Sequence, residues 1–208
     1  MDLNNFIKLF KKNEIDKTET IGFVYVKRKK IVTFVPLSFV DKLTFEMSFA
    51  GAGKIGNYDL CSFRTKGLGT FMPGNFARPF SGRKGKLAFE EEVRLEVECA
   101  EENLDGVIDA LLANHPYEEV AYEIYDFKKR SDTPSSVVIN FKNYVTFREI
   151  IARINKNVNL ENKDGKIKIK TLCLTNGEVN INIITKAKEK NCKLIIFSEK
   201  NKLKFKYI

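Results

Sequence analysis

Hydrophobic and polar side chains alternate most regularly between residues 88 and 99. Every second position from 90 to 98 carries a charge, and the opposite face consists of Phe89, Val93, Leu95, Val97 and Cys99. Such alternation is typical of a strand with one buried and one solvated face. Residues 31–35 and 120–124 predict further strands, because β-branched and aromatic side chains dominate them. A shorter strand is predicted at 58–63.

Apolar residues recur at helical spacing in two segments, 38–49 and 101–114. Ser38 is the expected N-cap of the first helix, and Pro116 closes the second. Residues 66–86, rich in glycine, proline and basic side chains, are expected to form a long loop. The order of elements is therefore β-α-β-loop-β-α-β. It predicts an α+β domain over 30–127, a ferredoxin-like plait with both helices on one face of a four-stranded sheet.

The rest of the chain divides around this domain. Residues 1–29 are expected to hold a small helix and a lead-in strand that turns at the basic run Lys27–Lys30. Residues 128–136 combine charge, serine and proline and are predicted to be a linker. Residues 137–208 predict a small basic α/β unit. Its first helix begins at a Thr146/Glu149 capping box and its second at Asn176 or Gly177.

Composition narrows the function classes. No apolar run approaches the roughly 20 residues that cross a bilayer, and the N-terminus does not read as a signal peptide, so a cytoplasmic protein without membrane association is expected. The four cysteines are widely spaced and are interpreted as reduced, mostly buried residues. The net charge of +9 is uneven, since residues 128–208 carry 19 lysines and arginines against 7 acidic residues. This excess favours either solvated faces or a nucleic-acid surface.

The segment GAGKIG (51–56) matches the spacing GxGxxG of dinucleotide-binding proteins. That fingerprint needs a strand before the glycines and a helix after them, whereas here a helix precedes and a strand follows. The glycines are therefore expected to let the helix reverse into the strand through positive φ angles. A second interpretation is an anion-binding nest of backbone N–H groups, with Lys54 adding charge.

The other candidate is the segment His115–Glu119, which contains the only histidine of the sequence. One interpretation is a helix C-terminus, at which the His115 ring meets free carbonyl groups and Pro116 blocks extension. The alternative pairs His115 with Glu118 as metal or ligand contacts at a subunit interface.

Two long motifs resemble a known family. AGAGKIGNYDLCSFRTKGLGTFMPG (50–74) and ALLANHPYEEVAYEIY (110–125) resemble the insert domain of the Nif-three-like family, also labelled GTP cyclohydrolase I type 2 homologue. The resemblance covers about 30–127, and the tail from residue 147 more weakly resembles the part that follows the insert. The insert is similar in fold to CutA and PII-type trimeric proteins, so the resemblance implies a homotrimer or a hexamer. Full-length members carry a dinuclear metal centre, whose histidine-rich motif and C-terminal His/Glu pair this sequence lacks.

The resemblance therefore implies a non-catalytic homo-oligomeric module without a cofactor, which binds a protein partner or a small anionic ligand. The expected ligand contacts are Gly51, Gly53, Lys54, Gly56, Asn57, Tyr58, Arg78, Arg83, Lys84, His115 and Glu118. Two alternatives stay open. One is a metal-dependent hydrolase, in which His115, Glu118 and Asp59 of neighbouring chains surround a metal. The other is nucleic-acid binding through the basic C-terminal unit.

Overall fold

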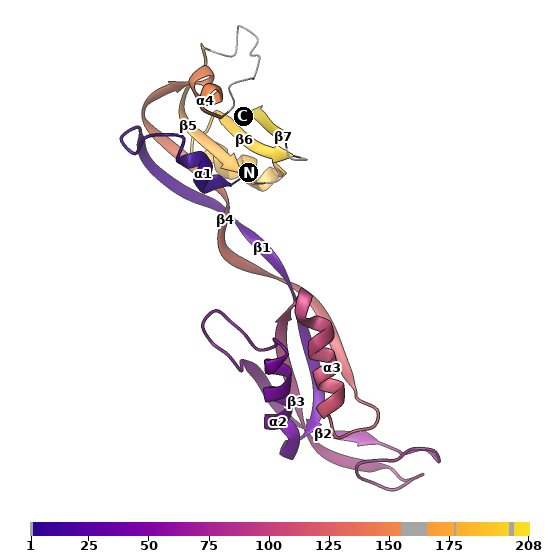
Figure 1. Cartoon of the computed structure of the whole chain (residues 1–208). Helices are drawn as coiled ribbons and strands as arrows, with labels where there is room; N and C mark the ends of the chain where they lie inside the picture. Colours follow the sequence, from indigo (N-terminus) through magenta and orange to yellow (C-terminus); the bar gives the residue numbers. More distant parts are fainter. Residues whose placement is uncertain (1, 155–165, 177, 200–201) are drawn as a thin grey trace. The chain divides into compact units, whose positions relative to one another are not determined.

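The computed structural model describes residues 2–154, 166–176, 178–199 and 202–208, which form two compact units. One unit is Val26–Lys129, and the other joins Met1–Tyr25 to Arg130–Ile208. The strands β1 (Ile15–Pro36) and β4 (Tyr122–Thr146) both run from one unit into the other (Figure 1). No helix among the described residues is long and apolar enough to cross a membrane.

Val26–Lys129 has the predicted order of elements. After β1 come a 3-10 turn (Leu37–Phe39), α2 (Val40–Phe49), β2 (Ser62–Phe71), β3 (Ala88–Ala100), a second 3-10 turn (Glu101–Asn103), α3 (Leu104–Asn114) and the start of β4. The hydrogen-bonded order is β2-β3-β1-β4, and β3 is antiparallel to both of its neighbours. This is a βαββαβ plait, so the predicted ferredoxin-like fold class is confirmed.

The core of this unit follows from the alternation in β3. Its odd-numbered side chains, from Val93 to Cys99, are buried in one cluster with residues of both helices, including Met47 of α2 and Leu111 of α3. The even-numbered charged side chains point to the opposite face, because successive residues of a strand face opposite ways. Both helices therefore lie on one side of the sheet, and burial of their apolar faces stabilises the plait.

Four local predictions in this unit are wrong. The strand expected at 58–63 begins only at Ser62, because Tyr58 bonds back to Ile55 and Leu60 has a φ of 58°. The basic run Lys27–Lys30 forms no turn, since β1 continues through it and pairs with β3 from Arg28 onward. β2 extends to Phe71, so the first six residues of the expected 66–86 loop are strand and pair in register with β3. Ser38 does not cap α2. It lies in the 3-10 turn, and the N-cap position is Phe39, which makes no side-chain cap.

The second unit is a sheet covered on both faces. Its elements are α1 (Leu3–Ile7), the first part of β1, the end of β4, α4 (Phe147–Ile154), β5 (Lys168–Thr175), α5 (Ile181–Glu189), β6 (Leu194–Glu199) and β7 (Lys202–Tyr207). The order is β4-β5-β6-β7, and only the pair β5–β6 is parallel among the registers described. Val137 and Ile139 pack with α1 and α4, whereas Val138 between them packs with Ala187 of α5.

The predicted linker is wrong, because residues 128–136 lie inside β4. Ser131 Oγ donates a hydrogen bond to the carbonyl oxygen of Val24 at 3.0 Å, and the backbone N–H of Asn176 donates to Ser135 O at 2.7 Å. These hydrogen bonds satisfy polar groups of the two serines, which the charged, serine-rich sequence suggested would be hydrated. The N-terminal helix, expected in a separate lead-in, buries Leu3 and Phe6 in the core of the C-terminal unit.

The Thr146/Glu149 capping box is confirmed. The Thr146 N–H donates to Glu149 Oε2 at 2.7 Å, and the Glu149 N–H donates to Thr146 Oγ1 at 3.2 Å. The expected start of the next helix is wrong at Asn176, and Gly177 lies outside the described residues. α5 begins at Ile181, where the side chain of Asn180 accepts a hydrogen bond from the Ile183 N–H at 3.0 Å.

Candidate ligand-binding site

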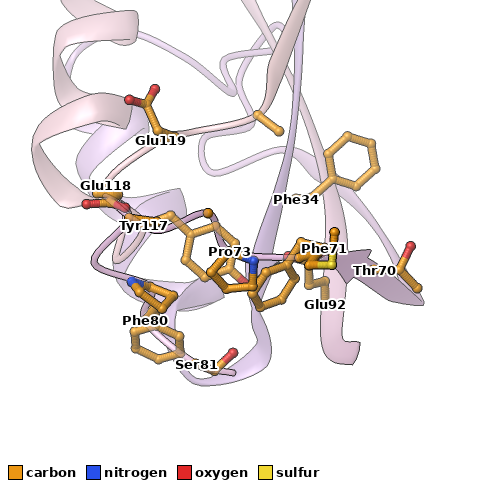
Figure 2. Close-up of a pocket in the computed structure, with 16 residues that line it drawn as sticks. Phe34, Thr70, Phe71, Pro73, Phe80, Ser81, Glu92, Tyr117, Glu118 and Glu119 are labelled. Atoms are coloured by element: carbon orange, nitrogen blue, oxygen red, sulfur yellow. Dashed lines mark hydrogen bonds between the residues drawn. The ribbon is translucent and has the colours of Figure 1, made fainter. Parts of the chain in front are cut away.

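The loop between β2 and β3 forms one wall of a pocket of about 420 Å³ within Val26–Lys129 (Figure 2). The two ends of the loop are tied together, because the Gly85 N–H donates to Pro73 O at 2.8 Å. Lys84 Nζ donates to Asn75 O at 2.8 Å. A third bond ties the loop to the segment after α3, since the Arg78 N–H donates to Glu118 Oε1 at 2.6 Å. The pocket is therefore built from the loop, β1, the β2–β3 hairpin and the 117–121 segment.

Aromatic rings form much of the pocket wall. Phe34, Phe71, Phe80 and Tyr117 all line it. The centroid of the Phe80 ring lies 5.7 Å from both the Phe39 ring and the Tyr117 ring. Contacts at this spacing stabilise aromatic pairs and hold the loop side chain in place. In Figure 2 the Tyr117 ring lies beside Pro73, with Phe80 at the outer side of the loop.

The polar groups of the pocket are mainly acidic. Glu92, Glu118 and Glu119 line it, and the Tyr117 hydroxyl donates a hydrogen bond to Glu92 Oε1 at 2.7 Å. Burial and the neighbouring Glu92 carboxylate raise the pKa of Tyr117 well above its usual range, so the phenol stays protonated and remains a donor. Gly69 makes room for this arrangement, because a Cβ atom there would lie 2.2 Å from Glu92 Oε2.

His115 is next to the pocket but does not line it. Its Nδ1 accepts a hydrogen bond from the Tyr117 N–H at 3.2 Å, so Nε2 carries the proton and donates to Phe34 O at 3.0 Å. Burial lowers the pKa of His115, against smaller opposing effects of Phe34 O and Glu92. His115 also ends α3 with its own N–H bonded to Leu111 O. The ring therefore meets a strand carbonyl and not, as the C-terminus interpretation has it, carbonyls of its own helix.

The glycine corner, residues 51–59, follows the C-terminal end of α2. Gly51, Gly53 and Gly56 have φ angles of 106°, 69° and 58°, as the tight reversal predicts. The N–H groups of Gly51, Ala52 and Gly53 donate to the carbonyls of Ser48, Met47 and Glu98. Ile55 and Tyr58 bond each other reciprocally. Backbone donors that already bond carbonyls are not free for an anion, so the nest interpretation has little support in this fold.

The predicted ligand contacts do not form one site. Glu118 is the member of that set that lines the pocket, and His115 adjoins it through Tyr117. Arg78, Arg83 and Lys84 are exposed on the pocket loop, but their side chains do not line the pocket. The glycine corner contributes exposed Lys54, whose Nζ lies 3.8 Å from Asp59 Oδ1, together with exposed Asn57 and Tyr58.

Sequence reasoning missed most of the pocket lining. The sequence pattern places them only at strand, loop or helix-end positions: Phe34, Phe71, Met72, Phe80, Glu92 and Tyr117. One signal could have indicated that the loop takes part in a site, although not its partners on the strands. The loop carries Met72, Phe76 and Phe80 among its glycines and prolines, and large apolar side chains are unusual in a loop that serves only as a solvated connection. Met72 and Phe80 do line the pocket, whereas Phe76 is 99% exposed and does not.

Comparisons with known proteins show what the chain resembles. No family model matches it. A GTP cyclohydrolase 1 type 2 homolog of Halalkalibacterium halodurans is 41% identical over 104 residues, which are 50% of this chain and 28% of that protein. The Bacillus subtilis protein of the same name is 37% identical over 141 residues, 65% of this chain and 37% of that protein.

A solved structure of a Bacillus cereus protein related to NIF3 aligns with 94% of the chain, at a TM-score of 0.54 and 25% identity. The resemblance to the Nif-three-like family is confirmed. The chain spans 52% of that structure, and the two curated matches cover little more than a third of those Nif-three-like relatives at most.

Proposed function

We propose that Val26–Lys129 is a non-catalytic binding module, which assembles as a homotrimer and takes a small ligand or a protein partner. The observation that carries the proposal is the pocket of about 420 Å³ under the β2–β3 loop. Its size lies in the range of small-molecule sites, and its lining combines apolar walls with a few polar groups, as such sites do. The loop is fastened at both ends, so the pocket is already formed in the free chain.

The state of His115 supports a binding role over a catalytic one. Both ring nitrogens are engaged, one with Phe34 O and the other with the Tyr117 N–H. A histidine used in this way has no lone pair left for a metal and no free nitrogen to accept a proton from a substrate. Asp59, the third residue of the metal hypothesis, lies on the glycine corner and faces Lys54.

Features of the sheet support assembly. The face opposite α2 and α3 carries ion pairs across the strands, including Lys30 Nζ to Glu96 Oε2 at 2.9 Å. Phe63 stands opposite Glu96 in the β2–β3 register and therefore on this same face, with 64% of its surface exposed. β2 is also an edge strand of ten residues, and exposed edges of that length favour pairing with another chain. The number of three subunits is taken from the family resemblance, because the insert is similar in fold to trimeric CutA and PII-type proteins.

Light scattering of the full chain during size-exclusion chromatography tests this proposal. The expected mass is three times the chain mass of 23.9 kDa. Phe63→Asp places a charge on the proposed interface and should return the mass to that of one chain. The matched control is Phe45→Asp, since Phe45 is 60% exposed on α2, away from that face. A wild-type chain that stays monomeric at all concentrations contradicts the assembly.

A further inference from the structure

We propose that the pocket under the β2–β3 loop binds a small organic cation, an ammonium group carried on an apolar body. The inference rests on the proposed binding function and names the ligand class for it. It departs from the small anionic ligand that the resemblance implies, because the basic side chains Arg78, Arg83 and Lys84 do not line the pocket. Its support is the charge of the lining, the nature of the walls and the carboxylate oxygens that remain for a ligand.

The charged residues that line the pocket are all acidic. Three carboxylates, Glu92, Glu118 and Glu119, line the pocket, and no lysine or arginine is among its lining residues. Beside the pocket, the Arg94 guanidinium lies 5.8 Å from the centroid of the Phe34 ring. Arg94 is already paired, with its Nε 3.0 Å from Glu96 Oε1. The lining is therefore acidic, which favours a cationic ligand and disfavours an anionic one.

The walls of the pocket are largely aromatic and apolar. A cation is attracted to the face of an aromatic ring, at about 0.5–1 kcal/mol per contact in exposed sites and more when water is excluded. Phe71, Phe80 and Tyr117 offer such rings, and Met72, Pro73 and Pro79 add apolar surface beside them. An inorganic cation would gain little from these walls. A ligand with an apolar body gains from the walls and from the carboxylates together.

Some carboxylate oxygens of the lining residues make no described hydrogen bond and can accept one from a ligand. Among the described residues, Glu119 has no hydrogen bond or ion pair, and Glu118 uses Oε1 for the Arg78 N–H. Glu92 uses Oε1 for the Tyr117 hydroxyl. In Figure 2 Glu118 and Glu119 extend from the segment next to Tyr117, whereas Glu92 comes from the strand on the other side. An ammonium group in the pocket is attracted by all three charges, and Glu92, beside Tyr117, keeps one oxygen that can accept a hydrogen bond from it.

Three matched probes test the inference on the full chain at pH 7: benzylammonium, benzyl alcohol and benzoate. They share one apolar body and differ in charge. The readout is the methyl carbon spectrum of the methionines, because Met72 lines the pocket and Met47 is fully buried in the core. Saturable shifts at Met72 without shifts at Met47 are expected, with benzylammonium binding about fivefold more tightly than benzyl alcohol and benzoate most weakly.

Two variants sharpen the test. Glu119→Gln should weaken benzylammonium about threefold and leave benzyl alcohol unchanged, since one nearby exposed charge is removed. Glu46→Gln removes an exposed carboxylate on α2 and should change neither. Equal or tighter binding of the alcohol or of benzoate overturns the inference, and so does a Met72 signal that none of the probes moves. Light scattering on the same sample separates the claims. A trimer that shows no preference for the cation would contradict this inference alone. A monomer that prefers the cation would contradict only the proposed trimer.

Discussion

Lowering the pH from 7.5 to 5.5 should destabilise Val26–Lys129 through His115. The folded state holds this ring neutral, because burial lowers its pKa and Nδ1 is needed as the acceptor of the Tyr117 N–H. The unfolded chain binds the proton with a pKa of about 6.5. Between the folded and unfolded pKa values the unfolded state holds more protons, so stability is fully present above about 6.5 and is lost as the pH falls.

The magnitude follows from this linkage. A single group changes the free energy of unfolding by at most about 1.4 kcal/mol per pH unit. Between pH 7.5 and pH 5.5 the loss is therefore limited to about 1.4 kcal/mol for a ring that stays neutral when folded. Hydrogen bonds to basic partners lower the pKa values of Glu14 and Glu96, so their contributions fade only below about pH 4.5.

Urea titrations followed by the amide NMR signals of Val26–Lys129 measure this loss without a contribution from the other unit. His115→Gln keeps an amide that can donate to Phe34 O and removes the titration, so its unfolding free energy should not change between pH 7.5 and pH 5.5. His115 is the only histidine, so its ring signals give the pKa directly. The reasoning is refuted by a folded pKa at or above 6.5, or by equal pH slopes in the two proteins.

Three further predictions concern local structure. Gly53→Ala should cost about 1–3 kcal/mol of stability, because its φ is positive and the new Cβ would meet Cys61 O at 3.0 Å, whereas Gly56→Ala, also at positive φ but with nothing within 4 Å, should cost about 1 kcal/mol in the same urea titration. Thr146→Ala should lower the urea stability of the C-terminal unit by about 1 kcal/mol through loss of the cap to Glu149, and an unchanged midpoint would contradict that role. A thiol reagent at pH 8 should modify Cys61 first, because the other three cysteines are buried and their pKa values are raised; two or more fast thiols would argue against the described cores.

Periodicity was enough to predict the plait. The alternation in β3 and the helical spacing of α2 and α3 are local signals, and the same side chains fill one core. The linker at 128–136 was mispredicted because charge and serine usually indicate solvent. Here Ser131 and Ser135 meet backbone groups of β1 and of the segment after β5, partners that are distant in sequence.

The pocket was beyond sequence reasoning for a similar reason. Tyr117 reaches Glu92 across 25 positions, and His115 reaches Phe34 across 81. No local pattern encodes such pairs, whereas the positive φ angles at the glycine corner could be predicted from one short segment. Residues that line a pocket between a loop and a helix end come together only when the whole plait has formed.

Native mass spectrometry of the full chain from a non-denaturing solution tests the trimer and its pocket together. It reports the number of subunits and any small molecule retained in the pocket under one condition. The account predicts a species of three times 23.9 kDa that gains the mass of benzylammonium when this amine is added. A single chain of 23.9 kDa that gains no mass from the amine at any concentration would contradict it.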